Sequence, residues 1–226
     1  LKCLPSRNHT EIMFKNVLKI PIKIKSKKKF DYIEIDGNKE FSSFNYNIPG
    51  DISSASFFIV LTLLSKNLNL KIKNINVNPS RIGIIKILNS MGGNIKFSNK
   101  KTYNGENVAD LKITSSKNLN SINLNPSLNS SAIDEFLLIF LVAGLSKGIS
   151  TFKNLEELNK KESKRLDWGY KILKMIGIKV LKIKNNGIKI WGNPKLKLNK
   201  TYIIKNYLKD HRVFMLSVIA ALTLGG

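Results

Sequence analysis

Two short segments of the chain carry acidic and basic side chains close together, and both could bind and react with anions. The first is Lys160–Leu166, in which one carboxylate, Glu162, lies among lysines and an arginine. The second is Asp210-His211-Arg212, an acid, an imidazole and a guanidinium in a row. Each segment precedes a pattern typical of a helix, whose start offers free N–H groups and a positive dipole end. The two segments therefore predict an enzyme site for phosphates or carboxylates.

An internal repeat of helix, strand, helix, strand and strand must position these residues. Its copies begin at Gly50-Asp51 and at Ile133-Asp134, and a third opens at Asp210. The helices that we expect are 54–64, 79–91, 135–145, 162–176 and 213–224, and the strands are 68–75, 94–97, 109–114, 149–152, 178–183 and 187–191. Repeated units of this kind imply an α/β domain in which helices pack on sheets.

The residues at the ends of the expected helices support these boundaries. Asp51 is a candidate helix cap, and Gly92 and Gly177 are placed to end helices. Before Pro49 the pattern differs, with a helix expected at 6–17 and strands at 20–24, 32–35 and 44–48. Pro49-Gly50 is a natural turn and a candidate domain junction.

Composition narrows the class of protein. The 226 residues include one cysteine, so a disulfide framework and a cysteine zinc site are excluded, and a reducing, cytoplasmic location is expected. The longest apolar stretches are too short to span a bilayer, which needs roughly 20 residues. The net charge of +23 raises nucleic acid as a partner. Because the lysines are scattered among many Asn and Ile residues, we attribute the charge mainly to compositional drift. Both ends look cut, which indicates an internal fragment of a longer protein.

Several motifs occur along the chain in one order and on the expected repeats. They are Ser6-Arg7-Asn8-His9-Thr10-Glu11, Pro49-Gly50-Asp51-Ile52-Ser53-Ser54-Ala55, Asn78-Pro79-Ser80-Arg81-Ile82-Gly83, Ile133-Asp134-Glu135, the Leu158–Leu166 segment and Asp210-His211-Arg212. Together they resemble the motifs of the enolpyruvyl transferases. The bacterial type of the branch that acts on shikimate 3-phosphate is most similar, and the resemblance covers nearly the whole chain.

The resemblance implies an α/β (α+β) fold of two domains, each built from three βαβαββ units in the arrangement called an inside-out α/β barrel. One domain is truncated in this chain. Residues 1–48 would be the end of the second domain, and residues 49–226 most of the first. This expectation agrees with the repeat found independently in the residues.

The implied reaction transfers the enolpyruvyl group of phosphoenolpyruvate to the 5-hydroxyl of shikimate 3-phosphate and releases phosphate. It would serve the shikimate pathway of aromatic amino acid biosynthesis. Both substrates are small anions, and the reaction needs no cofactor and no metal. Neither nucleic acid nor membrane is implied as a partner, and the full-length protein is expected to be a monomer.

The resemblance also assigns roles to residues. Asp134 corresponds to the family's catalytic aspartate, which contacts the shikimate hydroxyls and accepts a proton; the competing interpretation is a helix cap. Glu162 corresponds to the acidic residue that donates and accepts the proton of the methylene carbon. Its pKa could be raised by burial or lowered by the flanking lysines. Arg165 and Arg212 correspond to the arginines that bind phosphoenolpyruvate, since guanidinium suits a carboxylate.

The remaining candidates concern the other substrate. Ser6, Arg7 and Lys161 correspond to residues that bind or adjoin shikimate 3-phosphate. His211 is a further candidate site residue, for which a structural role is an equal alternative. Arg81 occupies the place in the first repeat that Arg165 occupies in the second, and we interpret it as structural.

Departures from the family pattern bear on activity. Lys164 stands where the family usually has Asp, so Arg165 is expected to lose a local partner. The N-terminal K-S-x-x-x-R segment, the S-A-Q segment and the C-terminal lysine of the family do not occur, so this fragment alone is expected to be inactive. Three rivals stay open: the branch acting on UDP-N-acetylglucosamine, a basic nucleic-acid-binding α/β protein, and a non-catalytic remnant.

Overall fold

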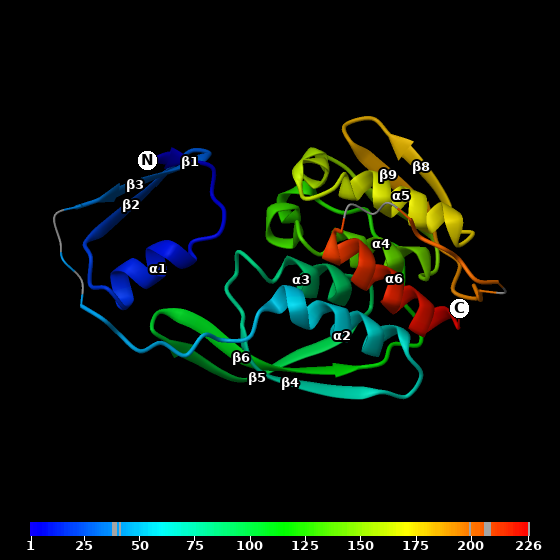
Figure 1. Ribbon diagram of the computed structural model, residues 1–226, viewed down its shortest axis with the longest axis horizontal. Helices are drawn as coiled ribbons and strands as arrows, with labels where there is room; N and C mark the ends of the chain where they lie inside the picture. The colour runs from blue at the N-terminus through cyan, green and yellow to red at the C-terminus, as the bar shows by residue number, and fades with distance from the viewer. Residues whose placement is uncertain (38–39, 41, 199, 206–208, 226) are drawn as a thin grey trace.

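A computed structural model describes residues 1–37, 40, 42–198, 200–205 and 209–225. Figure 1 shows a small N-terminal unit (dark blue) that is joined by an extended segment to a larger body. The extended segment enters the body at Gly50, whose N–H donates to the Asn74 carbonyl at 2.8 Å. This contact lies where the sequence predicted a junction.

The N-terminal unit contains β1 (Lys2–Cys3), α1 (His9–Asn16), β2 (Ile22–Lys27) and β3 (Phe30–Ile35). Its sheet has the order β1-β3-β2, with both pairs antiparallel. The predicted helix and the first two predicted strands are confirmed with shifted ends.

The strand predicted at 44–48 is wrong. Residues 44–48 are described but form no strand. The backbone N–H of Asn47 instead donates to the Tyr103 hydroxyl at 3.2 Å, and the Tyr46 and Tyr103 rings lie 5.4 Å apart. An alternating apolar pattern becomes a strand only where a neighbouring strand completes its hydrogen bonds, and here side-chain contacts take that place.

The first full repeat contains α2 (Ile52–Leu64), β4 (Asn69–Asn76), α3 (Gly83–Ser90), β5 (Asn94–Tyr103) and β6 (Glu106–Thr114). Its sheet has the order β4-β6-β5, in which β6 is antiparallel to both neighbours.

The second repeat contains α4 (Phe136–Gly144), β7 (Ile149–Phe152), α5 (Arg165–Met175), β8 (Lys179–Ile183) and β9 (Gly187–Trp191). Its sheet has the equivalent order β7-β9-β8, which confirms the predicted repeat. Three short 3-10 helices, η1 (Pro126–Leu128), η2 (Ser130–Ala132) and η3 (Glu156–Lys160), and the helix α6 (His211–Leu224) complete the described elements.

The core is built from the first helix of each repeat. α4 is buried along its whole length, and α2 and α6 pack against it and against each other. A helix that is apolar all round belongs in a protein core, and each fully buried Leu or Phe contributes about 1.5–3 kcal/mol. In Figure 1 these helices lie between the sheet of β4–β6 and the sheet of β7–β9. No helix in the described part of the chain is long and apolar enough to cross a bilayer.

The helix ends follow local chemistry. The Asp51 carboxylate caps α2 by accepting from the Ser54 N–H at 2.9 Å. Gly92 and Gly177 follow α3 and α5 with φ of 93° and 91°, a left-handed conformation that glycine adopts without steric cost. These predictions are confirmed.

Two predicted helices begin later than expected. α3 starts at Gly83 because the Asn78 side chain accepts from the Ser80 N–H at 2.9 Å and holds a turn before it. α5 starts at Arg165, so Glu162 precedes the helix instead of opening it. The turns in front of both helices carry side chains that face the candidate site.

Candidate active site

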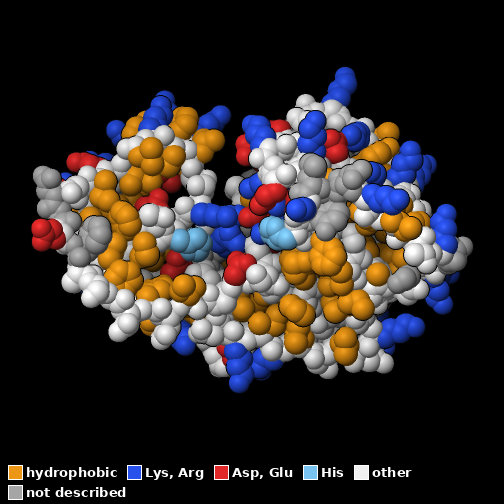
Figure 2. Space-filling model, viewed as in Figure 1, with side chains coloured by type: hydrophobic (Ala, Val, Ile, Leu, Met, Phe, Trp, Pro, Cys, Tyr) orange, Lys and Arg blue, Asp and Glu red, His pale blue; other side chains and the backbone are white. Residues whose placement is uncertain are grey.

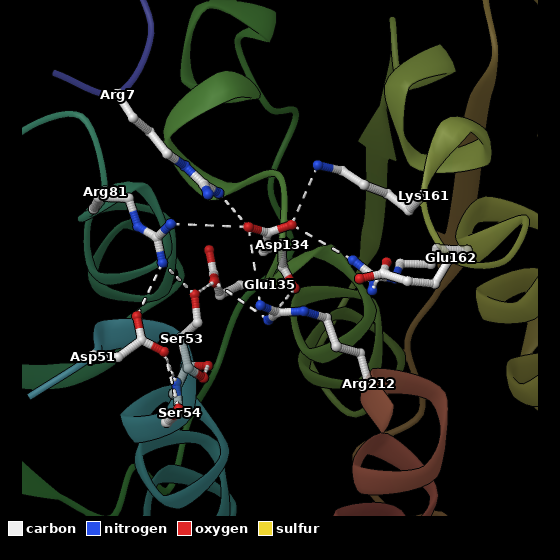
Figure 3. Close-up of polar contacts among 12 residues, drawn as sticks. Arg7, Asp51, Ser53, Ser54, Arg81, Asp134, Glu135, Lys161, Glu162 and Arg212 are labelled. Carbon is white, nitrogen blue, oxygen red and sulfur yellow. Dashed lines mark hydrogen bonds and ion pairs between the residues drawn. The ribbon is translucent and has the colours of Figure 1, made fainter. Parts of the chain in front are cut away.

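The N-terminal unit and the two full repeats each place one arginine before or at the start of the helix that follows their first strand. Arg7 lies between β1 and α1, Arg81 between β4 and α3, and Arg165 at the first position of α5 after β7. Figure 3 shows Arg7 and Arg81 pointing toward one carboxylate, that of Asp134. Arg165 Nη1 lies 3.5 Å from the same carboxylate. The repeat therefore produces a ring of cations from turns that are far apart in the sequence.

Asp134 lies between η2 and α4, and its side chain is 9% exposed. Arg7 donates a short hydrogen bond to its Oδ2. Lys161 comes from the loop before α5, and Arg212 from the start of α6. Four further nitrogen–oxygen distances are 3.5 Å for Lys161 Nζ, 3.5 Å for Arg165 Nη1, 3.9 Å for Arg81 Nη1 and 3.9 Å for Arg212 Nη2.

Asp134 does not cap α4, although its equivalents in the other repeats do cap helices. The Asp51 side chain accepts from Ser54 N–H, and the Asp210 side chain accepts from Arg212 N–H at 2.9 Å. The N-cap residue of α4 is Glu135, without a side-chain cap bond. The capping interpretation of Asp134 is therefore wrong, and its carboxylate faces the cations instead.

The cations control the titration of Asp134. Burial raises the pKa of this carboxyl, but the hydrogen bond from Arg7 and the charges of Arg212, Arg7 and Lys161 outweigh it and lower the pKa to about 2. Asp134 is therefore ionised at neutral pH, and it is a weak base as long as these cations surround it.

Arg165 is held by a second buried carboxylate. Its side chain is 2% exposed, and its Nε donates to Asp210 Oδ2 at 2.9 Å. Ser163 Oγ donates to the same oxygen at 2.7 Å. Burial raises the pKa of Asp210, but the hydrogen bonds from Arg165 and Ser163 outweigh it, so the net shift is downward. Arg165 therefore keeps carboxylate partners despite the lysine at position 164.

Glu162 lies at the open side of the cluster of charged side chains around Asp134. Its side chain is 57% exposed and forms a close ion pair with Arg165 Nη2. The buried environment that the sequence left open for this residue is not found. The neighbouring Lys161 is 29% exposed and contacts Asp134, so the two adjacent residues face different parts of the cluster.

Two predicted site residues lie outside these contacts. Ser6 is exposed and lines a groove of about 940 Å³ on the N-terminal unit. His211 is exposed at the first position of α6. Neither makes a polar contact with the cluster in the part of the chain that the structure describes.

The cluster is neutral in formal charge, although the chain as a whole is strongly basic. Five cations meet five carboxylates: Arg7, Arg81, Lys161, Arg165 and Arg212 against Asp51, Asp134, Glu135, Glu162 and Asp210. An anion that binds here must therefore exchange with existing ion pairs. Figure 2 shows Lys and Arg side chains (blue) at the base of a notch between the N-terminal unit and the body.

The described residues contain no group of three or more His, Cys, Asp and Glu side chains that could hold a metal ion. The arrangement can bind anions through guanidinium groups and can move protons through Asp134 and Glu162.

Sequence reasoning missed the buried neighbours of the cluster. Ser53 and Glu135 were not singled out, and for Arg81 a structural role was favoured over that of an extra cation, yet it lies 3.9 Å from Asp134. The signal for Arg81 was its place in the repeat, which matches that of Arg165 and was noted in the sequence but given too little weight. Ser53 and Glu135 gave no such signal, because ordinary helix starts contain the same residue types.

The comparisons with known proteins give one family. The family model described as EPSP synthase (3-phosphoshikimate 1-carboxyvinyltransferase) matches residues 1–226. The chain is 37% identical over 223 residues to a 3-phosphoshikimate 1-carboxyvinyltransferase of Thermoanaerobacter, covering 98% of this chain and 50% of that protein. It is 38% identical over 218 residues to a protein of the same name from Petrotoga mobilis, covering 96% and 48%.

Solved structures agree with this result. The EPSP synthase of Acinetobacter baumannii matches with a TM-score of 0.82 at 30% identity, over 98% of this chain and 49% of that one. The enolpyruvyl transferase NikO of Streptomyces tendae matches with a TM-score of 0.68 at 11% identity, over 98% and 47%, a likeness in fold alone. The chain thus spans about half the length of the relatives it matches.

Proposed function

The chain belongs to the EPSP synthase family, and we propose that the polypeptide containing it transfers the enolpyruvyl group of phosphoenolpyruvate to the 5-hydroxyl of shikimate 3-phosphate. The single observation that carries the proposal is the ring of five cations around Asp134. Two substrates that carry phosphate and carboxylate groups need such a set of cations, and one carboxylate among them can accept the proton of the attacking hydroxyl.

Four of the five cations divide between the two substrates. In our proposal Arg165 and Arg212 hold phosphoenolpyruvate, while Ser6, Arg7 and Lys161 face shikimate 3-phosphate. The Arg165 guanidinium is held from behind by Asp210, with Nε at 2.9 Å from the carboxylate, which restricts its rotation before substrate arrives. His211 is exposed next to Arg212, and no role is assigned to it.

The reaction would proceed in two steps. In the addition, the 5-hydroxyl oxygen bonds to C2 of phosphoenolpyruvate, its proton passes to Asp134, and Glu162 protonates the methylene carbon to give a methyl group. In the elimination, the methyl group returns a proton to Glu162 as the C–O bond to phosphate breaks and the vinyl double bond reforms, and the hydroxyl proton held by Asp134 passes to the departing phosphate. The exposed position of Glu162 at the edge of the cluster is compatible with a group that exchanges protons.

Substrate binding would also raise the basicity of Asp134. The cations that lower its pKa to about 2 are those proposed to bind substrate anions. When these anions pair with Arg7 and Arg212, the cations stabilise ionised Asp134 less, and its pKa rises toward a value at which it can accept a proton.

The proposed whole enzyme has two domains, with residues 1–48 ending one and residues 49–226 forming most of the other. We also propose that the whole enzyme is a cytoplasmic monomer.

Phosphate release by the polypeptide that contains this chain tests the proposal. We expect release that requires both phosphoenolpyruvate and shikimate 3-phosphate. Asp134→Asn should lower kcat by about 100-fold or more. Asp167→Asn, an equal change at an exposed carboxylate, should leave it unchanged. Turnover with UDP-N-acetylglucosamine in place of shikimate 3-phosphate, or an Asp134→Asn variant as active as the parent, would contradict the proposal.

A further inference from the structure

A second carboxylate lies directly beneath the cation ring. Glu135 follows Asp134 in the sequence, but its side chain lies inside the body and the residue is only 3% exposed. The Ser53 hydroxyl donates a short hydrogen bond to its Oε1, and Arg212 Nη1 lies 3.7 Å from the same atom. Figure 3 shows Asp134 and Glu135 contacting different sides of the Arg212 guanidinium.

Glu135 is itself oriented by a chain of contacts. Ser53 is 2% exposed and lies in the first turn of α2. Its oxygen accepts from Arg81 Nη2 at 2.6 Å while its proton goes to Glu135. A hydroxyl has one proton to donate, so using it this way fixes the orientation of the group. The series Arg81, Ser53, Glu135 and Arg212 thus connects the N-terminal ends of α3, α2, α4 and α6.

Stability alone does not account for this carboxylate. Burying a charge is costly even when it is paired, and an apolar residue of similar size often serves a core equally well. Burial raises the pKa of Glu135; Ser53, Arg212 and Arg81 reduce the increase, and Asp134 adds to it. A residue that is unfavourable in isolation and touches a substrate-binding arginine is a candidate for a positioning role.

Arg212 has few other anchors. Its Nη1 donates to the Asp134 backbone oxygen at 2.9 Å, and the carboxylates within 4 Å of its guanidinium in the described chain are those of Asp134 and Glu135. Asp134 is proposed to react with the other substrate, so its carboxylate is not free to hold Arg212 throughout the reaction. Glu135 is the carboxylate that remains.

We propose that Glu135 is a positioning residue that fixes Arg212 for phosphoenolpyruvate, with Ser53 and Arg81 fixing Glu135 in turn. The inference rests on the proposed function, in which Arg212 binds that substrate. Glu135 does not touch substrate in this account; it acts through the guanidinium.

Removing the charge of Glu135 would have two opposite effects on the binding of phosphoenolpyruvate, so the direction of the measured change distinguishes between them. Loss of a negative charge near the site would by itself strengthen the binding of an anion. Loss of the anchor would let the Arg212 side chain rotate and would weaken binding, because a misplaced binding group costs affinity and rate. If Glu135 positions Arg212, loss of its charge should weaken the binding of phosphoenolpyruvate. If Glu135 only balances the charge of Arg212, the same loss should strengthen that binding.

Glu135→Gln in the active polypeptide separates the two effects, since glutamine has the same shape and can still accept from Ser53. We expect the KM for phosphoenolpyruvate to rise about tenfold, with kcat and the KM for shikimate 3-phosphate changed less than about twofold. Ser53→Ala should also raise the KM for phosphoenolpyruvate. Glu157→Gln, at an exposed glutamate paired with Lys160, is the matched control and should change nothing. An unchanged or lower KM for phosphoenolpyruvate in Glu135→Gln would overturn the inference.

The pH profile gives a readout that loss of packing would not mimic. The groups facing Glu135 are Arg212 from α6, Arg81 from the turn before α3, Ser53 from α2 and its own neighbour Asp134. Because burial raises the pKa of Glu135, the negative charge that holds Arg212 should be lost at a higher pH than the charge of an exposed glutamate. The KM for phosphoenolpyruvate should rise on the acid side in the parent, and this rise should be absent in Glu135→Gln.

A measurement without turnover separates this inference from the proposed function. In the 226-residue chain, the Arg212 side-chain N–H signals in ¹⁵N NMR should be resolved at neutral pH and should broaden in Glu135→Gln. If no phosphate is released by the parent but the signals respond, the proposed function fails and the anchor stands. If the signals are the same in both chains, the anchor is refuted whatever the activity.

Discussion

At the scale of single residues, the account depends on one aspartate that is used differently from its equivalents. Asp51 and Asp210 cap helices, whereas Asp134 leaves α4 without a side-chain cap and receives the cations instead. A cap contributes about 1 kcal/mol. The second repeat gives up that contribution and gains a carboxylate surrounded by guanidinium groups. A stability sacrifice of this kind is common where a residue serves binding or chemistry.

The pH dependence of stability should report the environment of Asp134. Its pKa is about 2 when folded and 3.8 ordinarily. Its stabilising contribution is therefore present above about pH 4 and is lost as the pH falls toward 2. Urea unfolding between pH 7 and pH 2 should show Asp134→Asn losing about 1–2 kcal/mol less than the parent over the acid range, after allowing for solvent screening.

Asp167→Asn is the control for this titration, because Asp167 is an exposed carboxylate paired with Lys182 at the surface. Its curve should run parallel to that of the parent. Equal acid losses in Asp134→Asn and the parent would show that the cations do not stabilise the Asp134 carboxylate.

At the scale of elements, the sequence predicted correctly the features that depend on neighbouring residues, but not those that depend on residues far away in the chain. The apolar helices α2 and α4, the Asp51 cap and the glycine at position 92 depend on neighbours within a few residues, so the sequence predicted them. The strand at 44–48 failed because its existence depends on a pairing partner that the fold does not supply.

The same division applies to the site. Asp134, Lys161, Arg165 and Arg212 were predicted from motifs and come together in the structure. The contact between Arg81 and Asp134 links residues 53 positions apart, and the hydrogen bond between Ser53 and Glu135 links residues 82 positions apart. Such contacts depend on how the repeats pack, which residue types and spacing alone do not determine.

The packing of α3 against η2 gives a test at this scale. A methyl group on Gly83 would lie 2.4 Å from Ser131 Oγ and 2.6 Å from the Ser131 carbonyl carbon. Gly83→Ala should therefore displace the turn before Asp134 and lower the free energy of unfolding by about 1–3 kcal/mol. The higher helix propensity of alanine offsets at most about 1 kcal/mol.

Gly37→Ala is the matched control, since no atom of the described residues lies within 4 Å of the added methyl group. Its free energy of unfolding in urea should stay within about 0.5 kcal/mol of the parent. A Gly83→Ala variant that is as stable as the parent would mean that α3 and η2 do not pack as described.

At the scale of the whole molecule, the site joins two parts of the chain that meet through a small polar contact. His9 Nδ1 lies 2.5 Å from Glu106 Oε1, and Asn78 Nδ2 donates to Asn8 Oδ1 at 2.8 Å and to Glu106 Oε2 at 3.2 Å. Glu106 is 5% exposed. This contact fixes the start of α1 next to Arg7, so the N-terminal unit delivers one cation of the ring only while it is docked.

Removing the imidazole should loosen the N-terminal unit. His9→Ala leaves the buried Glu106 carboxylate with one fewer partner, at a cost of about 1–3 kcal/mol. Hydrogen exchange should speed up in residues 1–35 and stay unchanged in the sheet of β7–β9. Lys15→Ala, at an exposed position of the same helix, should leave both regions unchanged. Equal protection of residues 1–35 in His9→Ala and the parent would show that the contact between His9 and Glu106 does not hold the N-terminal unit against the body.

The most direct test of the central claim is the binding of shikimate 3-phosphate to the 226-residue chain, measured by calorimetry and NMR at fixed ionic strength. The account predicts saturable binding with a Kd of roughly 1 mM or tighter, near −4 kcal/mol. It also predicts shifted signals at Arg7, Asp134 and Lys161 and at least about tenfold weaker binding by Arg7→Ala and by shikimate without its phosphate. Binding no tighter than that of inorganic phosphate, or signal changes away from Asp134, would contradict the account.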